Sequence, residues 1–283
     1  MEVKVKQKGT GWVLGGSGGL GLATANAFAA DGWTVVSGAR SFPAQPVEKA
    51  NPVQLRLDVT REESCEAFVT QALLQSPKVD ALVCAAAVLV LGSCEQTSLG
   101  ELENVMQTNF LGTARMVQKA LPLMRKAGGG KIILFSSING LLGIPFQSAY
   151  TASKHAIEGY AECLAMETKP FGIQVSLVEP GDHRGGSQRT RLKAAMENES
   201  SPYRAAYQSA CATIARDECG GLSPDRLGQK VVKNANRKRM RFRLRVAKPD
   251  QRLAVLLHTV FPARAQFAIL RGYYTNGGEN KNA

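Results

Sequence analysis

The stretch Trp12-Val13-Leu14-Gly15-Gly16-Ser17-Gly18-Gly19-Leu20-Gly21 decides the fold of this chain. Its apolar residues predict a short buried strand, its glycines a tight turn, and the apolar spacing that follows predicts a helix. Gly15 permits the turn, Gly19 lets the backbone approach a pyrophosphate, and Gly21 lets helix and strand pack closely. The helix then presents N–H groups and its positive dipole end to a phosphate. We therefore predict a nucleotide site formed by Gly15, Ser17, Gly18, Gly19, Leu20 and Gly21.

Apolar strands alternate with helical patterns up to residue 180. Strands are predicted at residues 12–14, 34–36, 54–57, 81–84, 131–135 and 173–178, and helices at 22–31, 61–74, 99–123 and 148–167. Continuously apolar strands that alternate with helices are typical of a parallel sheet covered on both faces. We therefore predict one α/β domain over residues 1–283, a Rossmann-type doubly wound parallel sheet with helices on both faces.

The pattern beyond residue 180 is less regular. Helices are predicted at residues 191–211 and 224–234, a strand at 239–246, and a helix interrupted at Pro262 over 253–270. The polar residues of the tail, 276–283, predict a disordered end.

Positive charge gathers in the last third of the chain, whose formal net charge is +12. Lys+Arg and Asp+Glu number 15 each up to residue 180, and 20 against 8 beyond it. Arg239, Arg241, Arg243 and Arg245 alternate with apolar residues, which favours a strand with one solvated basic face. The alternative is an anionic partner such as a phosphorylated cofactor, an acidic substrate or a membrane surface. No nucleic-acid-binding motif accompanies the charge, so we expect no nucleic-acid partner.

The cysteines and the lengths of the apolar runs indicate the cellular compartment. The six cysteines are scattered, with no close pair and no metal-ligand spacing, so we expect free thiols and no metal site. No apolar run is long enough to span a bilayer, and residues 1–9 lead into no apolar segment typical of a signal peptide. We therefore expect a cytoplasmic protein.

The end of the second predicted strand indicates the cofactor. Sites for NAD place an acidic residue there, which binds the ribose 2′-OH. This chain has Ala39 followed by Arg40. A small side chain leaves room for a 2′-phosphate, and a guanidinium binds it through charge-assisted hydrogen bonds. We therefore predict NADP(H).

A Tyr-x-x-x-Lys pattern supplies the candidate chemistry. Tyr150 and Lys154 lie in a predicted helix, and residues four apart share a helix face. A nearby cation favours phenolate, so Lys154 is expected to lower the phenol pKa from about 10 towards working pH. Tyr150 is then a candidate general acid/base. Ser137 follows the strand predicted at 131–135, where its hydroxyl can stabilise an oxyanion.

Taken together, these motifs resemble the short-chain dehydrogenase/reductase family. The matching features are Gly15-x-x-x-Gly19-x-Gly21, Asp58-Val59, Asn109, Ser136-Ser137, Tyr150-x-x-x-Lys154 and Pro180-Gly181. Residues 142–146, 149–159 and 170–173 resemble the branch that contains 17β-hydroxysteroid dehydrogenase type 1 and the retinol dehydrogenases. The resemblance implies an enzyme that interconverts an alcohol and a carbonyl.

The resemblance also implies a role for each residue. Tyr150 would exchange the proton, Ser137 would orient the substrate oxygen, and Lys154 would hold the nicotinamide ribose. Asn109 would complete a proton relay, and a helix-distorting amide is its structural alternative. The remaining cofactor contacts would come from Asp58 and Val59 at adenine, Ala85 and Ala86 along the cofactor, and Pro180 and Gly181 at nicotinamide.

One departure from the family pattern lies after the fourth predicted strand. The family's Asn-Asn-Ala-Gly reads Cys84-Ala85-Ala86-Ala87 here, which removes an amide and adds a methyl close to the cofactor path. The change motivates a non-catalytic NADP-binding sensor as an alternative function. The complete Ser137, Tyr150, Lys154 and Asn109 set favours an enzyme.

The substrate is the least determined feature. We expect a small hydrophobic alcohol or ketone, a hydroxysteroid first, with residues 182–235 as a substrate lid. A retinoid or other lipid carbonyl is an alternative. So is a 3-oxoacyl thioester, whose acidic carrier the basic region would attract. The resemblance also implies a homodimer or homotetramer, and a membrane surface is a partner that we do not favour.

Overall fold

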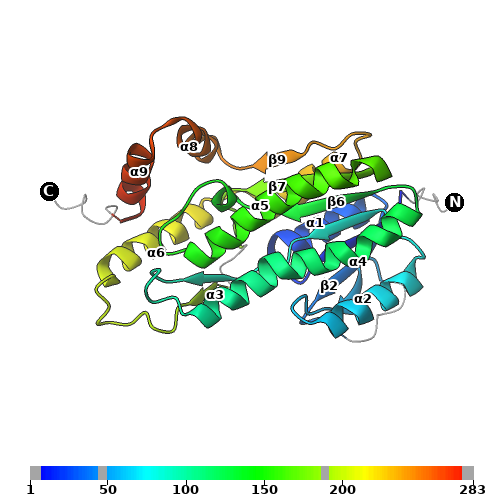
Figure 1. Ribbon diagram of the computed structural model, residues 1–283, viewed down its shortest axis with the longest axis horizontal. Coiled ribbons are helices and arrows are strands. Elements are labelled where there is room, and N and C mark those ends of the chain that lie inside the picture. The colour runs from blue at the N-terminus through cyan, green and yellow to red at the C-terminus, as the bar shows by residue number, and fades with distance from the viewer. Residues whose placement is uncertain (1–7, 44–49, 186–190, 276–283) are drawn as a thin grey trace.

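A computed structural model describes residues 8–43, 50–185 and 191–275, and within them a seven-stranded parallel sheet forms the centre of the molecule (Figure 1). Its strands are β1 (Thr10–Leu14), β2 (Thr34–Ala39), β3 (Val53–Arg56), β4 (Ala81–Cys84), β6 (Gly130–Phe135), β7 (Ile173–Pro180) and β9 (Arg243–Val246). Their order is β3-β2-β1-β4-β6-β7-β9, and every pairing is parallel. The order reverses between β1 and β4, which confirms the Rossmann-type doubly wound sheet and places its ligand crevice at that reversal.

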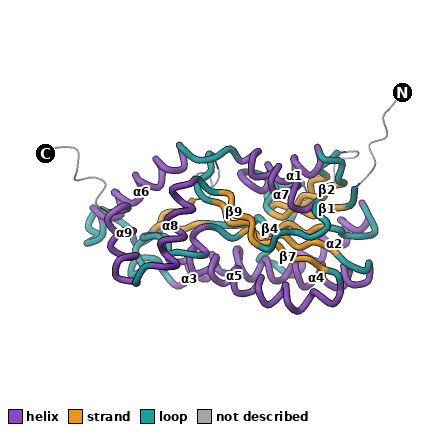
Figure 2. The backbone as a smooth tube through the Cα atoms, turned by 90° about the horizontal axis from the view of Figure 1, so that it is seen from above, coloured by secondary structure: helices purple, strands orange, loops and turns teal. Residues whose placement is uncertain are grey.

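Helices cover both faces of the sheet (Figure 2). One face carries α1 (Gly19–Ala30) and α7 (Pro224–Ala235), and the other carries α2 (Glu62–Gln75), α4 (Gly112–Lys126) and α5 (Ser148–Thr168). Strand β1 shows why its sequence is continuously apolar. Trp12 and Leu14 are buried on the α2–α4–α5 face, and Val13 is buried on the α1–α7 face. Both faces of the strand are therefore removed from water, and this burial of apolar surface stabilises the sheet.

A smaller unit extends beyond one end of the sheet. It contains β5 (Leu89–Leu91) paired in parallel with β8 (Arg191–Lys193), and helices α6 (Arg204–Cys219), α8 (Pro249–Val260) and α9 (Ala263–Thr275). In Figure 1, α6, α8 and α9 lie at the end of the molecule opposite α2. A separate apolar cluster joins these elements, with Leu91, Ile144, Tyr207 and Ile214 among its buried members.

The helix predicted at 99–123 is interrupted. Helix α3 (Leu99–Met106) runs into a π-helix, Gln107–Leu111, and continues as α4. Short 3-10 helices occupy Ile138–Gly140 and Lys169–Phe171. Of the helices in the described ranges, none combines the length and apolar character needed to cross a bilayer.

Beyond residue 180, one predicted helix is wrong and one predicted strand is shorter than expected. The helix predicted at 191–211 is strand β8, a turn and the start of α6. The strand predicted at 239–246 is confined to Arg243–Val246. Helix α7 falls within the predicted lid, but it packs on α1 as part of the layer that covers the sheet. The predicted helix at 253–270 is confirmed as α8 and α9, with the break at Pro262. The predicted disordered tail, 276–283, lies outside the described residues.

Candidate active site

A cavity of about 410 Å³ lies at the carboxyl ends of the strands and reaches α6 and α9. All the predicted cofactor residues line it, and so do three of the four predicted catalytic residues, Lys154 having been predicted in both roles. They are Gly15, Ser17, Gly18, Gly19, Leu20, Gly21, Arg40, Asp58, Val59, Ala85, Ala86, Lys154, Pro180 and Gly181, with Ser137 and Tyr150. Asn109 is the exception. The fold therefore brings motifs that are spread over residues 15–181 of the sequence to the wall of a single cavity.

The glycine-rich turn forms the base of the cavity. Gly15 has a φ of +84°, and a Cβ there would lie 2.6 Å from the Ala86 nitrogen. A Cβ on Gly21 would strike the carbonyl oxygen of Gly15. These two positions therefore require glycine because strand, helix and the β4 loop approach closely.

The start of α1 fits a phosphate group. Gly18 is the N-cap residue; no side chain caps the helix and no acidic residue lies in its first turn. A Cβ on Gly18 would meet no atom within 4 Å. The first N–H groups of α1 therefore face open cavity, which suits the pyrophosphate of a dinucleotide.

The ends of β2 and β3 form the predicted adenosine side. Arg40 follows β2, is exposed and lines the cavity, while Ala39 is buried. Burial raises the pKa of Asp58, but hydrogen bonds from Thr60 and the charge of Arg40 bring it below its usual value. The Thr60 hydroxyl donates to Asp58 Oδ1 at 2.7 Å. The Val59 carbonyl accepts a hydrogen bond from Arg115. Asp58 is thus a fixed carboxylate that can accept from an amine.

Tyr150, Lys154 and Ser137 meet at the centre of the cavity. Tyr150 lies in the first turn of α5, and Lys154 Nζ is 5.4 Å from the centroid of its ring. Ser137 follows β6 and lies close enough to Tyr150 for its hydroxyl to lower the pKa of the phenol. Lys154 Nζ donates to the Phe135 carbonyl at 2.7 Å, which ties α5 to the end of β6. A phenol, a hydroxyl and a buried cation therefore share one wall.

The pKa of Tyr150 differs from the sequence expectation. Burial raises it to about 12, against a lowering by the Ser137 hydrogen bond, and the Glu218 charge raises it further. Burial also lowers the pKa of Lys154 to about 8, against the charge of Glu158. The prediction that Lys154 brings the phenol pKa towards neutrality is wrong for this structure because desolvation of the phenol dominates. Tyr150 therefore holds its proton at neutral pH and is poised to donate it.

Asn109 lies behind the cavity wall. It sits in the π-helix and is fully buried. Its Oδ1 accepts from the Val88 N–H at 2.8 Å, and its Nδ2 donates to the Val88 carbonyl at 3.0 Å and to Ser153 Oγ at 2.9 Å. The Ser153 hydroxyl donates to the Tyr150 carbonyl at 2.7 Å. Asn109 thus lies where the helix is distorted, as its structural alternative predicts. Its connection to Tyr150 passes through Ser153.

Several lining residues are not among the site residues predicted from the sequence. Asn139 donates to Gln147 at 2.9 Å, and both line the cavity; the proximity of Asn139 to Ser137 is a signal that could have found it. His183 also lines the cavity and is buried, whereas Arg184 is exposed. The lining residues of α6 and α9 are Ile214, Asp217, Glu218 and Tyr274. No sequence motif marks them.

Comparison with known proteins agrees with this geometry. The family model described as short chain dehydrogenase matches residues 11–195. A 3-ketodihydrosphingosine reductase of Bacteroides thetaiotaomicron is 34% identical over 262 residues, 93% of this chain and 96% of that protein. Human 17-beta-hydroxysteroid dehydrogenase type 1 is 39% identical over 127 residues, 45% of this chain and 38% of its own length.

A solved structure extends the agreement to the whole fold. A short-chain dehydrogenase from Streptomyces avermitilis superposes with a TM-score of 0.78 at 28% identity, covering 92% of this chain and 96% of that one. The family region, residues 11–195, contains the glycine-rich turn and the helix that carries the Tyr-x-x-x-Lys pattern. The chain therefore belongs to the short-chain dehydrogenase/reductase family of oxidoreductases that act on CH–OH groups.

Proposed function

We propose that this protein is an NADP(H)-dependent reductase that converts the ketone of a long-chain hydrophobic substrate into a secondary alcohol. The observation that carries the proposal is the shared cavity wall. Tyr150, Ser137 and Lys154 line the same cavity as the glycine-rich turn. A proton donor, an oxyanion donor and a phosphate-binding helix start are then within one site.

The residues of the chain divide the chemistry. NADPH, when bound, supplies the hydride that reduces the carbonyl carbon. The hydroxyls of Ser137 and Tyr150 hydrogen-bond the carbonyl oxygen and stabilise the charge that develops on it. Tyr150 donates its proton to that oxygen, which completes the alcohol. Lys154, held by the Phe135 carbonyl, keeps positive charge beside the phenol and stabilises the phenolate that remains once the proton has been transferred.

The preference for NADPH rests on the end of β2. Arg40 is exposed at the cavity edge and Ala39 carries no carboxylate. A 2′-phosphate can therefore pair with the guanidinium without repulsion.

A keto lipid is our first substrate candidate, represented by 3-ketodihydrosphingosine. The relative of that name aligns over nearly its whole length, whereas the steroid dehydrogenase aligns over 38% of its own. Leu89, Ile144 and Ile214 give the cavity apolar surface for an alkyl chain. A hydroxysteroid is the second candidate, favoured by the 39% identity with the steroid enzyme.

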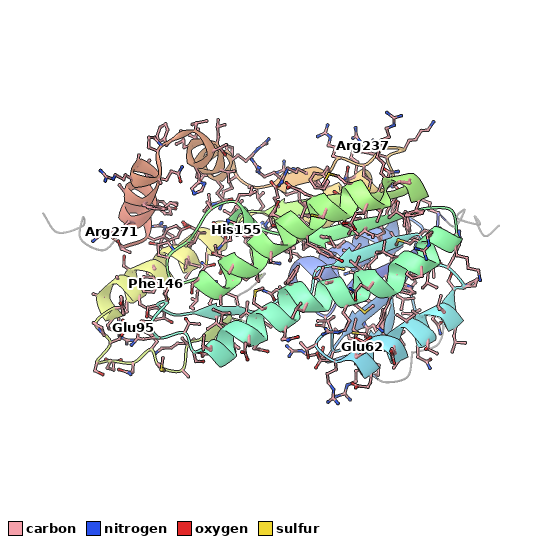
Figure 3. The ribbon with its side chains drawn as sticks, in the orientation of Figure 1. Glu62, Glu95, Phe146, His155, Arg237 and Arg271 are labelled. Carbon is pink, nitrogen blue, oxygen red and sulfur yellow. The ribbon has the colours of Figure 1, made fainter. Side chains whose placement is uncertain are left out.

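The arginines of β9 offer little free charge to attract the acidic carrier of a thioester. Arg243 and Arg245 both pair with the buried carboxylate of Glu179. Much of the basic strand is thus neutralised inside the protein. Arg237, before β9, and Arg271, on α9, lie far apart on the surface (Figure 3).

A turnover panel tests the proposal. Purified protein is mixed with 3-ketodihydrosphingosine, a steroid ketone, retinal and a 3-oxoacyl thioester, each with NADPH or NADH, and products are identified by mass spectrometry. We expect reduction of the keto lipid with NADPH. Cofactor binding without turnover of any ketone would contradict the proposal and favour the non-catalytic sensor.

A further inference from the structure

Helices α8 and α9 and the corner between them expose large apolar side chains. Six of these side chains are between 40% and 65% exposed: Leu253, Leu256, Val260, Phe261, Phe267 and Ile269. The buried side chain of α8 is Val255, and that of α9 is Tyr274. A soluble protein rarely gathers so much exposed apolar surface in one segment unless that segment is an interaction site.

Helix α8 is apolar on two sides. Val255 lies on the inner side and joins the buried apolar cluster that contains Ile144. Leu253, Leu256 and Val260 are spaced by three and four residues, so they share the other side of the helix. All three are exposed. The inner side packs the helix on the protein, whereas the outer side is apolar surface that folding leaves in water.

Positive charge accompanies the exposed apolar side chains. Arg252 on α8 and Arg264 and Arg271 on α9 are exposed, and none of the three forms a salt bridge with a residue in the described ranges. Asp250 is the only acidic residue in the sequence of the two helices. Figure 3 shows Arg271 at the end of the molecule that α9 forms. An apolar surface bordered by arginines is complementary to a negatively charged lipid surface.

A second basic group lies on the same side of the molecule. The segment before β9 exposes four basic side chains: Arg237, Lys238, Arg239 and Arg241. Figures 1 and 2 show α8, α9 and β9 along one side of the molecule, and Figure 3 shows Arg237 on that side. The apolar side chains of α8 and α9 and the basic residues of this segment can therefore meet one extended partner at the same time.

A second copy of this chain fits the surface less well than a lipid bilayer does. A two-fold contact places the same surface of each copy against the other. Such a contact at α8 and α9 would bring Arg252, Arg264 and Arg271 close to their own copies, with Asp250 as the only acidic residue that the two helices offer in return. An anionic bilayer supplies both an apolar interior and a negative surface, which matches the two kinds of side chain.

We propose that α8, α9 and the segment 237–241 bind the surface of a membrane that contains anionic lipids. The apolar side chains enter the boundary between headgroups and acyl chains, and the basic side chains contact the lipid phosphates. A membrane partner was not favoured from the sequence alone, because the sequence does not show whether these side chains are exposed. Tyr274 of α9 lines the cavity, so the bound membrane lies next to the substrate end of the cavity, the part that α6 and α9 line. The binding does not depend on the proposed reductase function.

Flotation with two kinds of vesicle tests the proposal without any variant. The vesicles consist of phosphatidylcholine alone or of phosphatidylcholine with phosphatidylserine, and the readout is the fraction of the protein that floats with the lipid. We expect binding to the vesicles with phosphatidylserine to be at least about 10-fold stronger, because each basic side chain near the surface adds to the attraction. Added salt should weaken this binding, since salt screens the attraction. Equal binding to both kinds of vesicle, or binding to neither, would overturn the proposal.

Variants of exposed apolar residues locate the binding surface. Leu256→Gln combined with Phe267→Gln should weaken binding about 10-fold to 100-fold, because two apolar side chains no longer leave water. Leu74→Gln is the matched control. Leu74 is 73% exposed, but it lies on α2, at the other end of the molecule (Figure 1). If the double variant and the control bind equally well, another surface binds the lipid and the proposal is wrong.

Charge variants and the oligomeric state complete the test. Arg264→Gln combined with Arg271→Gln should weaken binding to the phosphatidylserine vesicles about 10-fold, whereas Arg56→Gln, at an exposed position on β3, should not. Equal binding of these two proteins would contradict the contact with lipid phosphates. Sedimentation velocity examines the alternative partner. A dimer that the Leu256 and Phe267 substitutions separate, in a protein that binds no vesicle, would assign the surface to a second copy and overturn the proposal.

Discussion

Lys154 lies over the Tyr150 ring, with Nζ 5.4 Å from the ring centroid, and donates a hydrogen bond to the Phe135 carbonyl at 2.7 Å. The ammonium is therefore anchored to strand β6 and does not itself donate to the phenol oxygen. Lys154 is buried and Tyr150 is partly buried, and loss of water raises the pKa of Tyr150 to about 12 while lowering that of Lys154 to about 8. The pair favours a protonated phenol at neutral pH, which suits reduction.

Tyr150→Phe should lower kcat/KM for ketone reduction about 10²-fold to 10⁴-fold, because it removes the proton donor and leaves the ring in place. NADPH affinity, measured by fluorescence titration, should change little. Tyr160→Phe is the matched control on the same helix, where Tyr160 packs edge-on against Phe110. Equal activity of the two variants would show that the proton comes from elsewhere.

Lys154 should give ketone reduction an alkaline limit. Its pKa is lowered to about 8, so the ammonium loses its proton as pH rises through about 8, and the charge beside Tyr150 disappears. We expect kcat/KM, which reports groups of the free enzyme, to fall above that pH. In Lys154→Arg, whose side chain stays charged, the residual activity should show no such fall. A wild-type profile that is flat from pH 7 to pH 10 contradicts this assignment.

Arg40→Ala should weaken NADPH binding about 10-fold to 100-fold and leave NADH binding nearly unchanged. The reason is the loss of a charge-assisted hydrogen bond to the 2′-phosphate. Calorimetric titration with each cofactor measures the ratio of the two affinities. Arg56→Ala is the control, because Arg56 is exposed on the neighbouring strand and does not line the cavity. An equal loss of affinity for NADPH and NADH would show that Arg40 does not bind the 2′-phosphate.

The central fold could be predicted because its strands are apolar on both faces. Trp12 to Leu14 signals a strand buried between two helix layers, and the same pattern recurs in β4 and β6. The glycine turn and the Tyr150–Lys154 pair could be predicted for a different reason, since each acts through residues close to it in the chain. Strand β5 was not, because three residues at Leu89–Leu91 become a strand only by pairing with Arg191–Lys193, a hundred residues away.

The substrate end of the site could not be predicted either. Asp182, Glu218 and Tyr274 come from three distant segments and meet only through the packing of α6 and α9. The pKa of Tyr150 was predicted in the wrong direction because spacing reveals a neighbouring cation but not the loss of water around the phenol.

The alternating arginines near β9 predict a solvated basic face, but two of them, Arg243 and Arg245, form ion pairs with the buried Glu179. Arg243 donates to Glu179 at 2.7 Å, to Glu158 at 2.5 Å and to Glu162 at 2.7 Å. Glu179 is fully buried on β7. These pairs tie the last strand to β7 and α5, so the charge pattern serves the fold.

Arg243→Ala should lower the free energy of unfolding by about 2–4 kcal/mol, because it leaves the buried Glu179 with Arg245 alone. We expect a smaller loss of stability than for a fully buried ion pair, because the Arg243 side chain is 35% exposed. Urea denaturation measures the change. Arg239→Ala, at an exposed position before the strand, should alter stability by less than about 0.5 kcal/mol. Similar losses in both variants would contradict an internal role for Arg243.

Asp182→Asn should stabilise the protein at pH 8 and have little effect at pH 5. The folded-state pKa of Asp182 is raised to about 6 from 3.8, so the folded protein holds this proton more tightly than the unfolded chain. The folded state of the wild-type protein therefore loses stability as pH rises from about 4 through about 6, because the ionised carboxylate is less stable in the folded protein than in the unfolded chain. Above that range the whole of this destabilisation is present. The difference between these two pKa values corresponds to about 3 kcal/mol of stability. Partial solvent access reduces this to about 1–2 kcal/mol, which is about 2–6 °C in Tm. Differential scanning fluorimetry at both pH values measures the change, with Glu103→Gln as the exposed control on α3. A variant that is less stable at pH 8 would show that Asp182 is already neutralised in the folded protein.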